Sequence, residues 1–184
     1  MLYFYLSLMI AYPNPLGIHE QSPKRKYIRE IVDFAVNNSR DPYELVAIAI
    51  TESSLNPKAF SKTKDSGLFQ VNCRVWHEPL NYGGIISCQK AMMNLKVNTQ
   101  AGSHILSQYR KKYKQCRGTL AYRCYNGGPG WMKSANKDKI IKYSNKVKKV
   151  KRLLHKNYKY RKMIESMKFY ANVVLLTSQV IIND

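Results

Sequence analysis

The sequence has few acidic residues, few glycines and no apolar run long enough to cross a membrane. Its 184 residues include only 11 Asp+Glu and 9 Gly. So little glycine excludes a collagen-like chain, and the lack of an apolar run of about 20 residues excludes a polytopic membrane protein. Because 45% of the residues are hydrophobic, a disordered chain is excluded as well. The composition predicts one globular domain with basic additions.

The four cysteines are not spaced like metal ligands. They form no C-x-x-C pair, and no histidine lies at zinc-finger spacing from them, so we expect no metal site. An even number of cysteines in an exported chain favours two disulfides, for which three connectivities exist. We predict the pairs Cys73–Cys88 and Cys116–Cys124, because the members of each pair are nearest in sequence. Four buried thiols in a reducing compartment are the alternative.

Positive charge is concentrated towards the C-terminus. The chain carries 31 Lys+Arg, a net charge of +20, and residues 137–168 alone hold 13 Lys+Arg and two acidic residues. Such a segment suits an anionic cell wall, a membrane surface, an acidic protein partner or nucleic acid. A solvated helix face without a partner is the alternative.

Apolar segments lie at both ends of the chain. Residues 1–12, MLYFYLSLMIAY, are too short to span a bilayer and suit either an export signal or a packed N-terminal segment. Residues 169–182 carry no charge and are rich in Val, Leu and Ile. A strand, a docked helix or a contact with a membrane surface would each explain them.

The hydrophobic periodicity predicts a mainly α chain. We expect helices over 24–38, from Asp41-Pro42 to Asn56-Pro57, over 92–113 and over 119–125, with a polar loop at 57–66 and an extended or irregular turn at 67–72. The second helix is apolar nearly all round and should be buried. Gly127 and Gly128 should end the last one.

Glu52 lies near the end of that buried helix, in LVAIAITESSLNP. A carboxyl group leaving so apolar a stretch is costly to ionise, so we expect its pKa to be raised and its protonated form to be available as a general acid. Such an acid breaks a glycosidic bond by protonating the leaving oxygen. A surface Glu at a helix end, without function, is the alternative.

Three ordered motifs extend the pattern around Glu52. E-S-x-x-N-P is matched by 52–57, with Ser61 further on; G-L-[MF]-Q-[IV]-[NM] by 67–72; and A-Y-N-x-G-P-G, in a longer form, by 121–130, AYRCYNGGPG. The chain thereby resembles the lytic transglycosylase and goose-type lysozyme-like superfamily, whose catalytic domains cut bacterial peptidoglycan. The resemblance implies a mainly α, lysozyme-like single domain with a basic C-terminal extension.

The resemblance also suggests a division of the chain. We assign residues 1–23 to an apolar leader or N-terminal segment and 24–136 to the lysozyme-like catalytic domain. Residues 137–184 form the basic and then apolar extension, and we interpret its basic part, 137–168, as a tether.

The resemblance assigns roles to individual residues. Glu52 would protonate the bond between N-acetylmuramic acid and N-acetylglucosamine and then act as a base. The substrate's 2-acetamido group would support the charged centre, and its 6-hydroxyl would attack to give a 1,6-anhydro product without a cofactor. Ser61 and Gln70 would bind sugar substituents, while Tyr125 and Asn126 would lie opposite Glu52.

The roles of the motif tyrosine, of Asp65 and of Phe69 each have an alternative. Arg123 and Cys124 are inserted in the third motif, so Tyr122 and Tyr125 compete for the family's tyrosine; we favour Tyr125 because it directly precedes Asn-Gly-Gly-Pro-Gly. Asp65 lies where related lysozymes place a second carboxylate, or it caps a turn. For Phe69 we expect core packing rather than stacking on a sugar.

The resemblance favours a small, specialised lytic transglycosylase acting on peptidoglycan strands. The alternatives are a hydrolytic muramidase using Glu52 with Asp65, and a non-catalytic wall- or DNA-binding module. A secretion system, a pilus or a phage virion would need such local wall penetration, so we expect a periplasmic, extracellular or virion-associated protein. Nucleic acid is the less favoured partner of 137–168, because the motifs lie in the mildly basic body.

Overall fold

The computed structural model describes residues 16, 18 and 21–182, apart from the side chains of 158 and 177–182. The apolar segment 1–12 therefore lies outside the described residues. The helices are α2 (Lys24–Asn37), α3 (Pro42–Ser53), α4 (Cys73–Trp76), α5 (Ile85–Met92), α6 (Leu95–Lys112), α7 (Ala121–Gly127), α8 (Lys137–Lys156) and α9 (Tyr158–Ile182). Short 3-10 turns lie at Lys114–Cys116, Gly118–Leu120 and Trp131–Lys133. Strands β1 (Asp65–Ser66) and β2 (Val71–Asn72) pair antiparallel. The predicted mainly α fold is confirmed.

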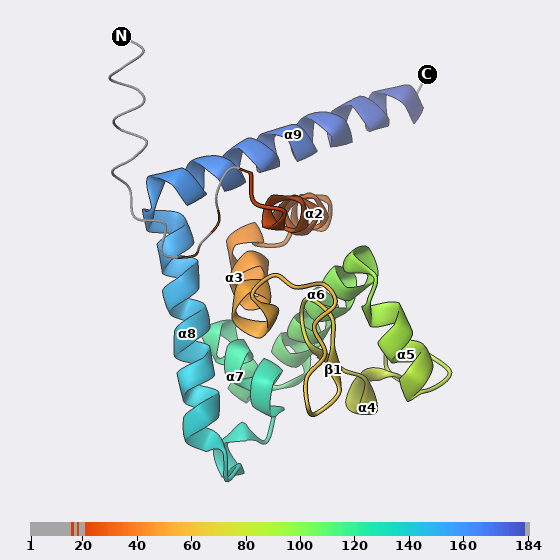
Figure 1. Cartoon of the computed structure of the whole chain (residues 1–184), viewed down its shortest axis with the longest axis vertical. Coiled ribbons are helices and arrows are strands. Elements are labelled where there is room, and N and C mark those ends of the chain that lie inside the picture. Colours follow the sequence, from red (N-terminus) through yellow and green to blue (C-terminus); the bar gives the residue numbers. More distant parts are fainter. Residues whose placement is uncertain (1–15, 17, 19–20, 183–184) are drawn as a thin grey trace.

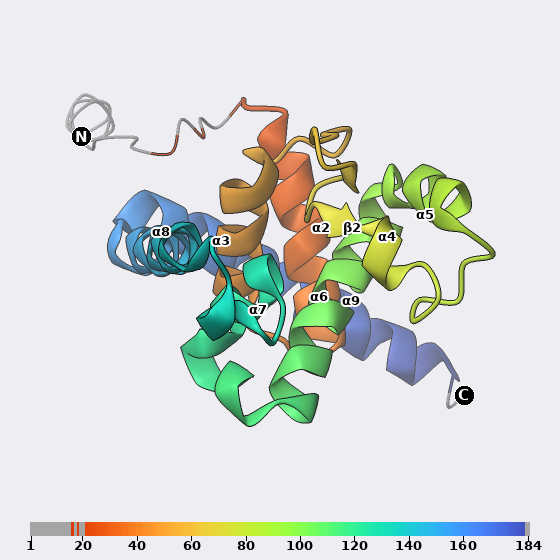
Figure 2. The same ribbon diagram turned by 90° about the horizontal axis from the view of Figure 1, so that it is seen from below.

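The helices enclose α3 from several sides. In Figure 1, α8 runs along one side of α3, and α9 turns away from it and crosses over α2. Figure 2 shows α7 between α8 and α6, with α4 and α5 on the far side of the molecule from α8. The β1–β2 hairpin contacts α6 through β2 and α5 through β1, and α4 packs on α5.

The first two predicted helices are confirmed. Asp41 caps α3, because its carboxylate accepts from the amides of Tyr43 at 2.9 Å and Glu44 at 3.2 Å. Residues 42–49 are all buried, as the apolar pattern indicated. The helix ends at Ser53, earlier than predicted, because Ser54 and Leu55 adopt left-handed backbone with φ of 54° and 64°.

The middle of the chain differs from the prediction in one element. Asn94 caps α6 with its side chain, so the helix begins at Leu95 rather than at 92. The preceding helix α5 was not predicted, because it buries only Cys88 and Met92 and leaves Ile86 exposed. A helix with so little apolar periodicity leaves no pattern in the sequence. Both predicted disulfides, Cys73–Cys88 and Cys116–Cys124, are confirmed.

Helix α8 begins at the predicted domain boundary and packs against the helices before it. Its buried residues face α3 and α7; they are Ile140, Ser144, Val147, Val150 and Leu154. The lysines of α8 lie on its other side, towards solvent. The boundary at 136 stays a prediction, and the packing shows that the first helix of the basic segment is a wall of the core.

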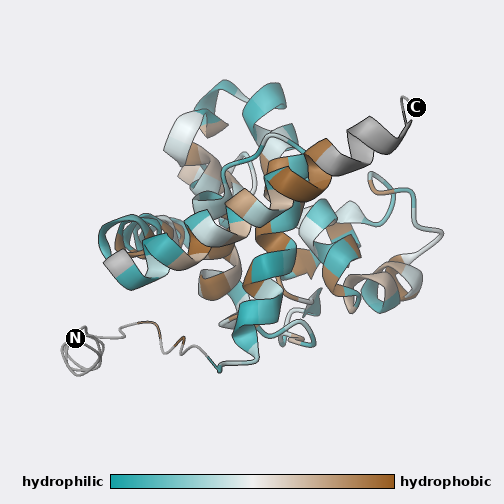
Figure 3. Cartoon of the chain, turned by 90° about the horizontal axis from the view of Figure 1, so that it is seen from above, coloured by the Kyte–Doolittle hydropathy of each residue, from teal (hydrophilic) through white to brown (hydrophobic). Residues whose placement is uncertain are grey.

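The apolar C-terminal stretch is helical and docks on α2 through its first half. Tyr160, Ile164, Met167 and Ala171 are buried there, whereas Phe169, Tyr170 and Leu176 are 62–65% exposed. Figure 3 shows hydrophobic residues on the surface of α9 towards its C-terminal end. The strand alternative for 169–182 is therefore wrong. Within the described residues, no helix has both the length and the apolar character that a membrane span needs.

An ion pair with a buried carboxylate joins α3, α6 and α7. Both carboxylate oxygens of Glu44 accept from the Arg110 guanidinium at 2.7 Å, and the Tyr122 hydroxyl donates to Oε1 at 2.6 Å. Burial alone would raise the pKa of Glu44, but the hydrogen bonds from Arg110 and Tyr122 hold it below its usual value. Tyr122 is thus committed to a structural contact.

Phe69 packs in the core, as expected, and leaves no room at Gly102 of α6. A methyl group at Gly102 would lie 2.5–2.7 Å from three atoms of the Phe69 side chain. We predict that Gly102→Ala lowers the free energy of unfolding by about 2 kcal/mol, because the core must shift to accept the extra atom. Urea unfolding measures the effect. Gly130→Ala is the matched control, since a methyl group there meets nothing within 4 Å; an equal loss in both variants would contradict the packing argument.

Candidate active site

Glu52 lies in the last turn of α3, where its carboxyl group is held by a tyrosine. The Tyr143 hydroxyl of α8 donates to Glu52 Oε1 at 2.6 Å. Burial is the main reason that the pKa of Glu52 is raised to about 7. The hydrogen bond from Tyr143 and the charge of Lys146 lower the pKa, while the charge of Asp65 raises it further. A proton on this carboxyl group is therefore available near neutral pH.

Tyr143 was not among the site residues predicted from the sequence. It lies 91 residues after Glu52, in the segment interpreted as a tether. Burial and the nearby Glu52 charge raise the pKa of Tyr143 well above its usual value, so its hydroxyl stays protonated and remains a donor. The signal that could have found it is the stripe Ile140, Tyr143 and Val147, which marks an inward face between lysines.

The turn at residues 67–72 is fixed from three directions. The Ser53 hydroxyl donates to Leu68 O at 2.8 Å, and the Tyr125 hydroxyl donates to Phe69 O at 2.8 Å. Asn98 of α6, buried completely, accepts from Phe69 N at 2.7 Å and donates to Ser66 O at 2.9 Å. Ser53 of the first motif, the second motif and Tyr125 of the third therefore meet at one turn.

Gly67 and Gln70 explain the shape of this turn. Gly67 has φ of 78°, and a Cβ there would clash with Met92 O and the Asn98 side chain, so only glycine fits. Gln70 has φ of 47°, and its amide group donates to Gly67 O at 2.8 Å and Ala59 O at 3.2 Å. The side-chain nitrogen of Gln70 therefore holds the turn together. That Gln70 binds a sugar substituent, through Oε1, stays a prediction.

Ser61 and Asp65 form a small hydrogen-bonded loop next to the turn. Asp65 N donates to Ser61 Oγ at 2.9 Å, while Ser61 Oγ and Thr63 Oγ1 donate to Asp65 Oδ2 at 3.1 and 2.6 Å. The other carboxylate oxygen, Oδ1, is buried without a hydrogen bond from the described part of the chain. Asp65 is thus tied to its loop and also lies near enough to Glu52 to raise its pKa.

Tyr125 lies beside Glu52, and Asn126 lies on the surface. Burial, followed by the charge of Glu52, raises the pKa of Tyr125 well above its usual value. The side chain of Asn126 is exposed on α7. The structure therefore brings Glu52, Asp65 and Tyr125 together, and the predicted sugar contacts of Ser61, Gln70 and Asn126 stay predictions. The described residues contain no cluster of three His, Cys, Asp or Glu side chains able to hold a metal ion.

The raised pKa of Glu52 has a consequence for stability. The folded protein keeps a proton that the unfolded chain releases between about pH 4.5 and 7, so the stability falls across this window as the pH rises. We predict that Glu52→Gln is more stable, relative to the unchanged protein, at pH 8 than at pH 4 by on the order of 2 kcal/mol. Urea unfolding at both pH values measures the difference.

Glu165 provides a control of opposite sign. The Tyr43 hydroxyl donates to it at 2.6 Å and lowers its pKa, so its stabilising effect is present above the usual pKa and lost in acid. Glu165→Gln should therefore cost more stability at pH 8 than at pH 4. If Glu52→Gln behaved in the same direction as Glu165→Gln, the raised pKa of Glu52 would be contradicted.

Comparison with known proteins places the chain. The family model described as the transglycosylase SLT domain matches residues 31–148, well over half of the 184 residues. None of the curated proteins matches the chain. The matched region contains all three motifs and reaches into α8, so that it includes Tyr143 and Lys146 as well as Glu52. The chain belongs to the transglycosylase SLT domain family, within the lytic transglycosylase and lysozyme-like superfamily.

Proposed function

We propose that this protein is a peptidoglycan lytic transglycosylase that uses Glu52 as its single acid and base. The bond cleaved is the β-1,4 bond from N-acetylmuramic acid to N-acetylglucosamine. The observation that carries the proposal is a carboxyl group with a pKa of about 7 that accepts a hydrogen bond from Tyr143. Membership of the family supports a peptidoglycan substrate.

In the first step, Glu52 gives its proton to the glycosidic oxygen. Because the Tyr143 hydroxyl already donates to Oε1, the acidic proton belongs on Oε2. The bond between C1 of the muramic acid sugar and this oxygen breaks, and the oxygen leaves as the 4-hydroxyl of N-acetylglucosamine. The carbonyl oxygen of the 2-acetamido group supplies an electron pair to C1, so no second carboxylate is needed.

In the second step, the Glu52 carboxylate acts as a base. It takes the proton of the 6-hydroxyl of the same sugar, whose oxygen attacks C1 and releases the acetamido group. The product is a 1,6-anhydro sugar, and Glu52 is again protonated. Tyr125 lies beside Glu52, where its hydroxyl is held by Phe69 O, and we assign it to orienting the acetamido group. Ser61, Gln70 and Asn126 are assigned to the remaining sugar substituents.

Asp65 supports a second candidate, a hydrolytic muramidase. Its Oδ1 is buried without a hydrogen bond from the described residues, and its charge acts on Glu52. A carboxylate in such a position can act as a nucleophile or activate a water molecule. The two candidates share Glu52 and differ in what attacks C1.

The setting of the protein is a further part of the proposal. Two disulfides are typical of an oxidising compartment, which supports action in the periplasm, outside the cell or from a virion. We assign the protein to local penetration of the wall by a secretion system, a pilus or a phage particle. The exposed lysines of 137–168 would hold it on an anionic wall, a membrane surface or an acidic protein.

The product of a wall digest tests the proposal. Purified peptidoglycan treated with the protein should yield 1,6-anhydro ends, measured by mass spectrometry. Glu52→Gln should lower the rate by about 100- to 10,000-fold, because the general acid is lost. Reducing ends alone, together with an equal loss in Asp65→Asn, would establish the muramidase instead. No digestion by either form, with salt-sensitive DNA binding, would support a binding module.

The pH profile tests the role of Tyr143. Activity of the unchanged protein should fall as the pH rises through about 7, where Glu52 loses its proton. In Tyr143→Phe this alkaline limb should move to higher pH, because a hydrogen bond that lowers the pKa is removed. The rate at the optimum should fall roughly tenfold, the effect of one hydrogen bond to a charged group.

Tyr122→Phe is the matched control for this profile. The Tyr122 hydroxyl donates to Glu44 and not to Glu52, so its removal should cost stability and leave the alkaline limb in place. A limb that stayed fixed in Tyr143→Phe, or moved equally in both variants, would rule out Tyr143 as the residue that positions the acid.

A further inference from the structure

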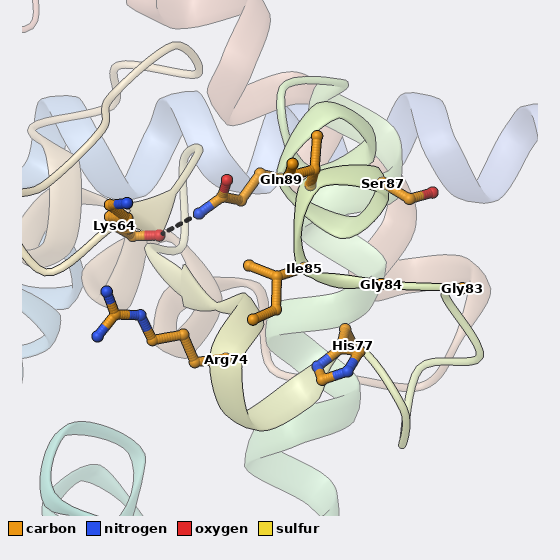
Figure 4. Close-up of a pocket in the computed structure, with 9 residues that line it drawn as sticks. Lys64, Arg74, His77, Gly83, Gly84, Ile85, Ser87 and Gln89 are labelled. Carbon is orange, nitrogen blue, oxygen red and sulfur yellow. Dashed lines mark hydrogen bonds between the residues drawn. The ribbon is translucent and has the colours of Figure 1, made fainter.

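A hollow of about 680 Å³ opens between the loop before β1, helix α4 and helix α5. Its volume lies in the range of pockets that bind small molecules. The residues that matter for recognition are Lys64, Arg74, His77, Ile85, Ile86 and Gln89. Figure 4 shows Lys64 and Arg74 on one side of the hollow and His77 on the other, with Ile85 between them. The wall is therefore cationic on one side and aliphatic in the middle.

The fixed charges of this pocket are not neutralised by the protein. Neither the Lys64 ammonium nor the Arg74 guanidinium has an ion pair among the described residues, and no acidic residue lines the hollow. His77 differs, because its ring nitrogens contact Cys73 O at 2.9 Å and the Glu78 carboxylate at 3.8 Å. The pocket thus offers two free cations to a ligand with negative charge.

The apolar part of the pocket narrows the class of ligand. Ile85 and Ile86 are 38% and 70% exposed although both are large hydrophobic side chains. A purely ionic ligand such as a phosphate would leave them in water. A ligand with methylene groups between its carboxylates would cover them and also reach the two cations.

The walls of the pocket are held in place before any ligand binds. The disulfide Cys73–Cys88 joins the start of α4 to the middle of α5. The Gln89 amide also donates to Lys64 O at 3.3 Å, so α5 is tied to the loop before β1. Such preorganisation lowers the entropy that binding must overcome.

The pocket adjoins the candidate active site along the chain. Lys64 directly precedes Asp65, whose charge acts on Glu52, and Arg74 follows the 67–72 turn after β2. We propose that this pocket binds the carboxylates of the peptide stem attached to the muramic acid sugar of peptidoglycan. The inference rests on the proposed function for the glycan strand, and adds a part of the substrate that Glu52 does not touch.

Binding of the free peptide tests the pocket separately from catalysis. The full chain carrying Glu52→Gln is titrated, by calorimetry at low salt, with a synthetic stem tetrapeptide and with the same peptide after its carboxylates are converted to amides. We expect the amidated peptide to bind at least tenfold more weakly. Arg74→Gln should raise the Kd for the acidic peptide about tenfold, and Lys64→Asn should act in the same direction while keeping a residue that tolerates φ of 67°.

Lys62→Gln is the matched control, because this exposed lysine lies two residues from Lys64 and does not line the pocket. Its Kd should stay unchanged. Equal Kd values for the two peptides, no effect of Arg74→Gln, or an equal effect of Lys62→Gln would each overturn the proposal. A selective effect of Arg74→Gln on a single-stranded oligonucleotide, with none on the peptide, would do so too.

A parallel digest separates this inference from the proposed function. The unchanged protein is given glycan strands with their peptides and the same strands after an amidase has removed them. Faster cleavage of the peptide-bearing strands, with the advantage lost in Arg74→Gln, supports the pocket. Cleavage of both kinds of strand at equal rates would be consistent with the proposed function and would contradict peptide binding by the pocket. Peptide binding without any cleavage would remove the proposed function and keep the pocket.

Discussion

The structure depends on one carboxyl group that is costly to ionise. Glu52 leaves α3 at its C-terminal end, where the helix dipole is negative and an anion is disfavoured. Residues 42–49 of the same helix are buried, so the carboxyl group cannot move out to solvent with its helix. Its proton is therefore retained to about pH 7. Helix α8 packs along α3 and brings the Tyr143 hydroxyl against this carboxyl group.

The 67–72 turn converts this burial into a defined geometry. Backbone groups at such a turn need partners, because an unpaired buried amide or carbonyl is costly. Here the partners come from three separate helices: Ser53 from α3, Asn98 from α6 and Tyr125 from α7. Each of these side chains holds the turn and at the same time ties its own helix to it. Some motif residues that the sequence suggests as substrate contacts therefore have a structural role, because they hold the turn in place.

Features that depend on residues close together in the sequence could be predicted from local patterns. Asp41 followed by Pro42 predicted the start of α3, and the apolar run after it predicted burial. The disulfides joined cysteines near in sequence. Tyr143 and Asn98 were not predictable in this way, because their partners lie 91 and 29 residues away. Their roles follow from how helices pack, and no spacing rule reports that.

Much of the +20 charge of the chain lies on α8, and its lysines affect Glu52 only when they lie close to it. The inward side of α8 brings Tyr143 to Glu52, and Lys146, three residues later, lowers the pKa of the same carboxyl group. The exposed lysines beyond about 8 Å from Glu52 are screened from it at physiological salt. Their number can change without altering the acid, whereas the register of α8 cannot. A shift of α8 by one residue would turn Tyr143 by about 100° away from Glu52, so the inward stripe, rather than the charge, is what constrains this helix.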